Sequence, residues 1–190
     1  MFRIQSSRRL MSVAVLCFVA VAASVAQEGE FQAPEPSPEH EQMAREAGVW
    51  DAKCKLWFTP DSEAVESNAT ETNTMLGKFW LLSEFKGNFG GMEFTGHGQF
   101  GYDPTAKKCV GTWIDTISPY MQTMEGTYDT KTHTLTMTIK GFDFQTNKTV
   151  QGKNVTTYID NNTKKFEMYG PSPNGEQFKM MEIMYTRRAK

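Results

Sequence analysis

Apolar and polar residues alternate along residues 49–58, where Asp51, Lys53 and Lys55 share one face. The opposite face is apolar and consists of Trp50, Ala52, Cys54, Leu56 and Phe58. A period of two is typical of a strand with one buried side. The segment therefore predicts a strand that turns its aromatic and aliphatic face toward a core.

A β-hairpin is predicted over residues 94–115. Pro104 presets the backbone for a turn, and Asp103 is of the type that hydrogen-bonds its own backbone two residues on. The same order of aromatic strand end, Asp, polar turn and second strand returns at residues 127–137 and 158–168. Repeated hairpins indicate an antiparallel meander.

The fold class predicted is all-β, an up-and-down antiparallel barrel of about ten strands. Such strands must close or stack to hide their edges, and at this number a barrel is wider than side chains alone fill. An open sandwich is the alternative. The remaining strands are expected near residues 63–75, 79–85, 121–128, 134–142, 149–159, 165–169 and 177–186.

A short helix is predicted before the first strand. Ser37 suits the N-cap position, Pro38 suits the first helical position, and Gly48 is placed to stop the helix. We expect this helix to cap one end of the barrel through its apolar side, which carries Met43, Ala44 and Ala47.

The N-terminus reads as a cleaved signal peptide, residues 1–26. Three arginines precede the apolar run of residues 10–21, and small residues end at Ala26. Proline-bearing residues 27–37 follow as a flexible linker, and residues 38–190 form a single domain. The protein is therefore expected to be exported, to the periplasm or the extracellular space.

Charge and hydropathy limit the expected partners. Without residues 1–26 the chain has 17 basic and 22 acidic residues, a formal net charge of −5, and no basic stripe. Nucleic acid is therefore not expected as a partner. The apolar run is short for a membrane span, so no integral span is expected in the mature form. The sequence leaves the oligomeric state open.

No metal site or cofactor is predicted. The three histidines, His40, His97 and His133, show no metal-ligand spacing with one another or with a cysteine. His40 and His133 are expected to be solvated. His97 alternates opposite to the aromatic face of its strand, so it should point outward and cannot serve as an interior haem ligand. Cys54 and Cys109 are expected to stay unbridged, because three strands separate them.

The catalytic candidates are acids, and the leading pair is Asp115 and Glu125; Glu84 and Glu182, within apolar runs, raise the same question. Asp115 and Glu125 fall on adjacent predicted strands, where facing carboxyls would shift one pKa upward for hydrolase or isomerase chemistry. In the simpler interpretation Glu125 faces solvent and Asp115 ends a strand. An enzymatic function is therefore not favoured.

The leading interpretation is non-catalytic binding of a small apolar or amphipathic molecule inside the barrel. Glycine leaves room in a strand, while Trp and Tyr supply apolar walls with a polar tip. Methionines in the predicted strands suit either an adaptable cavity or ordinary core filling. A filled barrel with a structural or interaction role remains open. The predicted ligand-binding residues are Trp50, Gly98, Tyr102, Trp113 and Asp115.

Four blocks carry a resemblance to a known family: residues 36–50, the FGYDPTAKKCVGTWID segment at residues 100–115, residues 123–129 and residues 178–187. In this order they resemble a bacterial family, domain of unknown function 1579. The resemblance implies a calycin-type barrel, akin to lipocalins and fatty-acid-binding proteins, and no settled activity. Cys54, Cys109 and His97 depart from the family pattern, so chemistry resting on them would not transfer to relatives.

Overall fold

The computed structural model describes residues 34–143, 147–172 and 174–189. The predicted signal peptide and most of the predicted linker lie outside the described residues. Within these ranges, no helix is long and apolar enough to cross a membrane.

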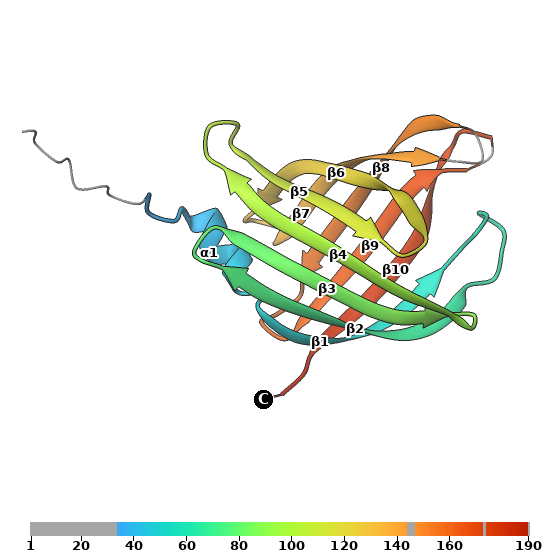
Figure 1. Ribbon diagram of the computed structural model, residues 1–190, viewed down its shortest axis with the longest axis horizontal. Coiled ribbons are helices and arrows are strands. Elements are labelled where there is room, and N and C mark those ends of the chain that lie inside the picture. The colour runs from blue at the N-terminus through green and yellow to red at the C-terminus, as the bar shows by residue number, and fades with distance from the viewer. Residues whose placement is uncertain (1–33, 144–146, 173, 190) are drawn as a thin grey trace, which may run out of the picture. The chain divides into compact units, whose positions relative to one another are not determined.

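Ten antiparallel strands form a closed barrel (Figure 1). Each strand pairs with its neighbours in the sequence, and β10 pairs back to β1 with Ala52 opposite Tyr185. The predicted up-and-down barrel is confirmed and the open sandwich is excluded. The strands are β1 (Gly48–Leu56), β2 (Val65–Leu76), β3 (Trp80–Phe89), β4 (Met92–Asp103), β5 (Lys108–Asp115), β6 (Ser118–Asp129), β7 (Thr134–Asp143), β8 (Lys148–Tyr158), β9 (Thr163–Pro171) and β10 (Gln177–Arg187).

The predicted hairpin over residues 94–115 is β4 and β5. Asp103 forms the predicted turn, since its Oδ1 accepts hydrogen bonds from the Thr105 amide at 2.8 Å and the Ala106 amide at 3.0 Å. These bonds satisfy backbone donors that the strand ladder leaves free.

Helix α1 (Pro38–Ala44) lies at one end of the barrel and contacts β3 and β4 (Figure 1). Ser37 is the N-cap, and its amide donates to His40 Nδ1 at 3.1 Å. His40 packs edge-on against Phe79 and Tyr102, with ring centroids 5.2 and 5.7 Å away. The prediction that His40 is solvated was wrong, because the capping helix presses it against the strands and leaves it 5 % exposed.

The barrel interior holds two clusters of buried residues. One joins β1, β3 and β10 around Trp50, Cys54 and Phe85, and the other joins β5, β6 and β7 around Cys109 and Met137. Cys54 and Cys109 are free thiols, as predicted. Burial raises the pKa of both to about 11, so they are not reactive thiolates at neutral pH.

Candidate functional site

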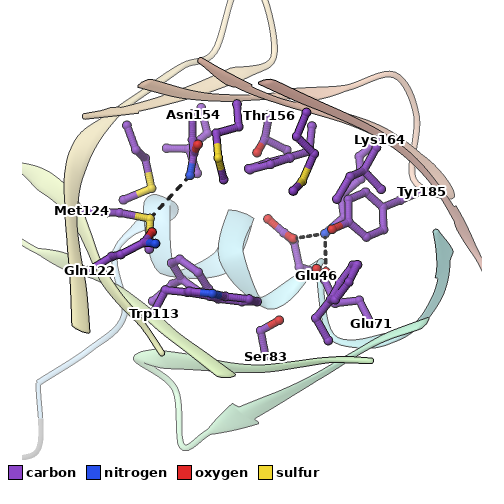
Figure 2. Close-up of a pocket in the computed structure, with 18 of the residues that line it drawn as sticks. Glu46, Glu71, Ser83, Trp113, Gln122, Met124, Asn154, Thr156, Lys164 and Tyr185 are labelled. Atoms are coloured by element: carbon purple, nitrogen blue, oxygen red, sulfur yellow. Dashed lines mark hydrogen bonds and ion pairs between the residues drawn. The ribbon is translucent and has the colours of Figure 1, made fainter. Parts of the chain in front are cut away.

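A cavity of about 490 Å³ occupies the barrel (Figure 2). Every strand and α1 contribute lining residues. This volume exceeds the roughly 300 Å³ at which small-molecule sites begin. The barrel is therefore not filled by its own side chains.

The walls of the cavity are mainly apolar. Aromatic and methionine side chains are among the lining residues, and flexible thioethers adapt well to apolar ligands of irregular shape. The methionines were predicted to serve either a cavity or the core. Met168 and Met181 line the cavity and are only partly buried, whereas Met124 and Met137 line the cavity and also belong to the buried core. Leu81, Phe85, Phe100 and Phe166 are further apolar residues of the lining.

A buried ion cluster closes the α1 end of the cavity. Lys164 Nζ on β9 lies 2.5 Å from Glu46 Oε2 and 2.9 Å from Glu71 Oε1 (Figure 2). The three side chains are only 5, 13 and 11 % exposed, respectively. Glu46 lies in the connection between α1 and β1, so the cluster ties the capping segment to β2 and β9.

Strand register explains why these side chains meet. Lys164 stands opposite Tyr158 of β8 and opposite Tyr185 of β10, so three adjacent strands place them in one row. Beyond the β1–β10 pairing that closes the barrel, Trp50 on β1 stands opposite Glu71 on β2. Residues opposite each other in a ladder share a face, so all five side chains turn inward.

Hydrogen bonds and aromatic rings complete this cluster. Tyr158 donates its hydroxyl to Glu46, and Asn73 Nδ2 donates to Glu71 Oε1 at 2.8 Å. The Lys164 ammonium lies 4.8 Å from the ring centroid of Trp50 and 4.6 Å from that of Tyr185. The positive charge is therefore held by two carboxylates and two π faces.

Lys164 and Glu71 keep their charges at neutral pH. Burial alone would lower the pKa of Lys164, but the charges of Glu46 and Glu71 outweigh it and raise that pKa above its ordinary value. For Glu71 the two effects are reversed. Burial alone would raise its pKa, but the Lys164 charge outweighs burial and holds that pKa below its usual range. Lys164 therefore stays an ammonium and is no amine nucleophile.

Both tyrosines of the cluster remain protonated. Burial and the neighbouring carboxylates raise the pKa of Tyr158 and Tyr185 well above the ordinary value. They act as hydrogen-bond donors and not as bases. Ionised carboxylates, an ammonium and neutral phenols together make a fixed polar end.

The opposite end of the cavity, which we call the mouth, carries exposed apolar side chains and one carboxylate, that of Asp115. It lies at the connections β1–β2, β3–β4 and β5–β6, where Phe58, Met92 and Ile117 are 71, 50 and 50 % exposed. These three residues also line the cavity. The cavity therefore reaches solvent through a rim of apolar side chains.

Two of the five predicted ligand-binding residues line the cavity, Trp113 and Asp115. Trp113 Nε1 donates to Asp115 Oδ2 at 3.1 Å, and the Ile117 amide donates to Asp115 Oδ1 at 3.0 Å. Trp50 and Tyr102 are not in the lining. Trp50 lies beneath the ion cluster, and Tyr102 packs against His40.

Gly98 does not line the cavity either. A Cβ on Gly98 would lie 2.5 Å from Phe100 Cε2 and 3.1 Å from Trp113 Cε3. The space that this glycine leaves is filled by two rings from its own hairpin. The prediction that Gly98 opens room for a ligand is therefore corrected: the glycine lets aromatic side chains lie close to the backbone.

The structure does not bring Asp115 and Glu125 together. Glu125 stands opposite Val110 on the outer face, where its Oε2 lies 3.2 Å from Lys108 Nζ. Asp115 lies on the inner face and lines the cavity. Side chains alternate between the two faces of a strand, so these two carboxylates lie on opposite faces of the barrel wall. The predicted pair thus lacks the contact that its acid–base chemistry requires.

His97 points outward, as predicted. Its side chain is 55 % exposed and its Nε2 lies 3.9 Å from Glu84 Oε1. Among the residues that the structure describes, no group of three or more His, Cys, Asp or Glu side chains is arranged to hold a metal ion.

Sequence reasoning missed the ion cluster. Lys164 follows a polar turn and is next to Lys165, a context typical of a solvated face. Strand alternation held the signal, because Lys164 shares its face with Phe166 and Met168, which line the cavity. Glu71 alternates with Asn73 in the same way. The contribution of Glu46 had no comparable signal, since it depends on how α1 joins the barrel.

Comparisons with known proteins agree with this architecture. The family model "Protein of unknown function (DUF1579)" matches residues 35–187. Among curated proteins, none matches the sequence.

Two solved structures share the fold at low sequence identity. Rv2717c from M. tuberculosis has a TM-score of 0.64 and 11 % identity, over 82 % of this chain and 100 % of that chain. The S-type phycobiliprotein lyase CPES from Guillardia theta has a TM-score of 0.54 and 10 % identity, over 80 % of this chain and 93 % of that chain. At these identities the likeness establishes the barrel fold alone.

Proposed function

Because the chain belongs to the DUF1579 family, whose description assigns no activity, we propose its function from the geometry of the barrel: it binds one small amphipathic molecule in the central cavity. The polar part of the ligand lies toward the ion cluster and the apolar part toward the mouth. The binding is non-catalytic.

The observation that carries this proposal is the cavity of about 490 Å³, with mainly apolar walls and an ion cluster at its α1 end. Ligand pockets combine mostly apolar lining with a few polar groups that fix orientation. A filled barrel with a structural role needs no such space. The mouth gives a ligand a route in that leaves the ion cluster intact.

The test uses a neutral apolar fluorophore, N-phenyl-1-naphthylamine, titrated into the mature protein. We expect saturable binding that dodecanol displaces. The blocking variant is Thr156→Phe, because Thr156 lines the cavity and its side chain points into it (Figure 2). This variant should lose most of the binding.

The matched control is Thr157→Phe, one residue along β8 on the outer face. Thr157 stands opposite Thr134, away from the lining. The Thr157→Phe variant adds the same aromatic ring but places it outside the cavity. Equal binding by both variants, or no saturable binding by the wild type, would contradict the proposal.

We also propose that the protein is exported. The support is the order of basic, apolar and small residues in residues 1–26. Intact-mass analysis of the protein from the producing cell should find a chain that begins at Gln27. A chain retained at Met1 would contradict export by this route.

A further inference from the structure

The ionisable side chains that line the cavity are strongly unbalanced. Among the described lining residues, one ammonium, that of Lys164, stands against four carboxylates: those of Glu39, Glu46 and Glu71 toward the α1 end and that of Asp115 at the mouth. This is a formal excess of three negative charges. Arg187 does not offset it within the cavity, because its guanidinium packs on Trp50 and lines a separate pocket at the α1 end.

The one cation among the described lining residues already has partners. Lys164 pairs with both Glu46 and Glu71 and is 5 % exposed. Two of its three N–H donors serve these carboxylates, and its Nζ also lies against the rings of Trp50 and Tyr185. An anion at this end would compete with those contacts and lie close to two carboxylates, which is unfavourable.

The hydrogen-bond donors near the carboxylates are used as well. At the α1 end, Tyr158 donates to Glu46 and Asn73 donates to Glu71. A carboxylate head group entering this end would therefore find its best donors occupied.

Two buried amide oxygens of lining residues have no hydrogen-bond partner. Asn73 Oδ1 has no hydrogen-bond partner, and its orientation is fixed because the amide nitrogen must face Glu71. Asn154 Oδ1 also has no partner, while its Nδ2 makes only a weak contact with Met124 Sδ at 3.6 Å (Figure 2). A group that brings positive charge and donors suits such a lining.

We propose that the cavity takes an amphipathic cation, of the class of long-chain primary amines, in preference to a fatty-acid anion. The ammonium lies at the α1 end beside Glu46, Glu71 and Asn73, and the hydrocarbon chain runs toward Phe58 and Met92 at the mouth. This assignment rests on the proposed function, which it deepens by naming the head group.

The test compares three ligands with the same chain length, dodecylamine, dodecanol and dodecanoate. Each competes with N-phenyl-1-naphthylamine at pH 7, below its micelle concentration. We expect dodecylamine to bind at least about tenfold more tightly than dodecanoate, with dodecanol between them, since a charge beside a partly buried carboxylate is worth more than one in water.

Two variants locate the preference. Glu71→Gln should cut the ratio of amine to carboxylate affinity severalfold, because it removes a lining charge. Glu125→Gln removes the same charge from the outer face, where Glu125 pairs with Lys108, and should leave the ratio unchanged. Glu46→Gln replaces Glu71→Gln if that variant does not fold.

The outcomes separate this inference from the proposed function. Failure of dodecanol to displace the fluorophore overturns both. Displacement by dodecanol together with dodecanoate binding as tightly as dodecylamine overturns the head-group assignment alone. An amine preference that Glu125→Gln and Glu71→Gln reduce equally also overturns it, because the preference then reflects overall charge.

Discussion

The two ends of the cavity differ in whether their side chains are already paired with one another. At the α1 end, Lys164, Glu46 and Glu71 hold one another, and little of them is exposed. At the mouth, Phe58 and Met92 line the cavity and are exposed to solvent. One end is fixed by charge pairing, whereas the other is available to an apolar chain.

This difference indicates separate roles for stability and binding. Removing one member of a buried ion pair leaves an uncompensated charge, which is costly. Removing an exposed apolar side chain leaves almost nothing unsatisfied. We therefore expect stability to depend on the α1 end and ligand entry to depend on the mouth.

The largest expected effect is that of Lys164→Met. Without the ammonium, Glu46 and Glu71 face each other in a buried site, and the free energy of unfolding should fall by about 3–5 kcal/mol. Urea denaturation measures the change. Lys165→Met is the control: Lys165 is 35 % exposed and pairs with Glu167, so its loss should cost no more than about 1 kcal/mol. Equal effects of the two substitutions would contradict the role of the ion cluster.

The pH dependence of stability should change sign in that variant. In the wild type, Glu71 has a lowered pKa, so its contribution is present above its unfolded pKa of 4.5 and is lost as the pH falls through the lower folded value. In Lys164→Met, protonation instead relieves repulsion between two carboxylates. Its stability should rise as the pH falls toward that range. Urea unfolding between pH 3 and pH 7 should show the wild type losing stability below about pH 4.5 and Lys164→Met gaining it as the pH falls; parallel slopes would contradict the account.

The stability of the wild type should also depend on this cluster at alkaline pH. Lys164, Tyr158 and Tyr185 all have a raised pKa in the folded protein. Their contributions are fully present below the unfolded values of 10.5 for lysine and 10.0 for tyrosine, and they are lost as the pH rises further. Stability should therefore fall above about pH 10.

A smaller loss is expected from Gly98→Leu, outside both ends of the cavity. The new side chain would collide with Phe100 and Trp113, and overpacking of this kind typically costs about 1–3 kcal/mol. The control is Gln99→Leu, at an exposed position on the outer face of β4. Thermal unfolding distinguishes them. A Gly98→Leu variant as stable as Gln99→Leu would show that the rings move aside freely.

The smallest effect on stability is expected at the mouth. Phe58 is 71 % exposed, so Phe58→Ser should change the free energy of unfolding by no more than about 0.5 kcal/mol. Urea denaturation measures this. A loss as large as that of Lys164→Met would mean that the mouth is part of the stabilising core.

The fold was largely predictable from the sequence because local signals repeat along it. Alternation in residues 49–58 and the Asp103–Pro104 turn each predict their element independently, and meander order then favours closure. Trp113 and Asp115 line the cavity because they share one inward face of β5; their role in binding stays a prediction.

The ion cluster was not predictable, since it depends on strand register. Lys164 meets Tyr158 and Tyr185 only through pairing across three strands, and no local pattern specifies such a row. Gly98 was misjudged for a related reason. Its sequence marks an absent side chain, but only the packing of Phe100 and Trp113 decides what fills the space.

The most direct test of the central claim is native mass spectrometry of the protein as purified from its producing cell. We predict one small amphipathic molecule per chain, carrying an amine, which is lost in Thr156→Phe and retained in Thr157→Phe. Wild-type protein that carries no molecule and also takes up no added dodecylamine would contradict the claim. A molecule retained equally by both variants would contradict it too, because the site would then lie outside the cavity.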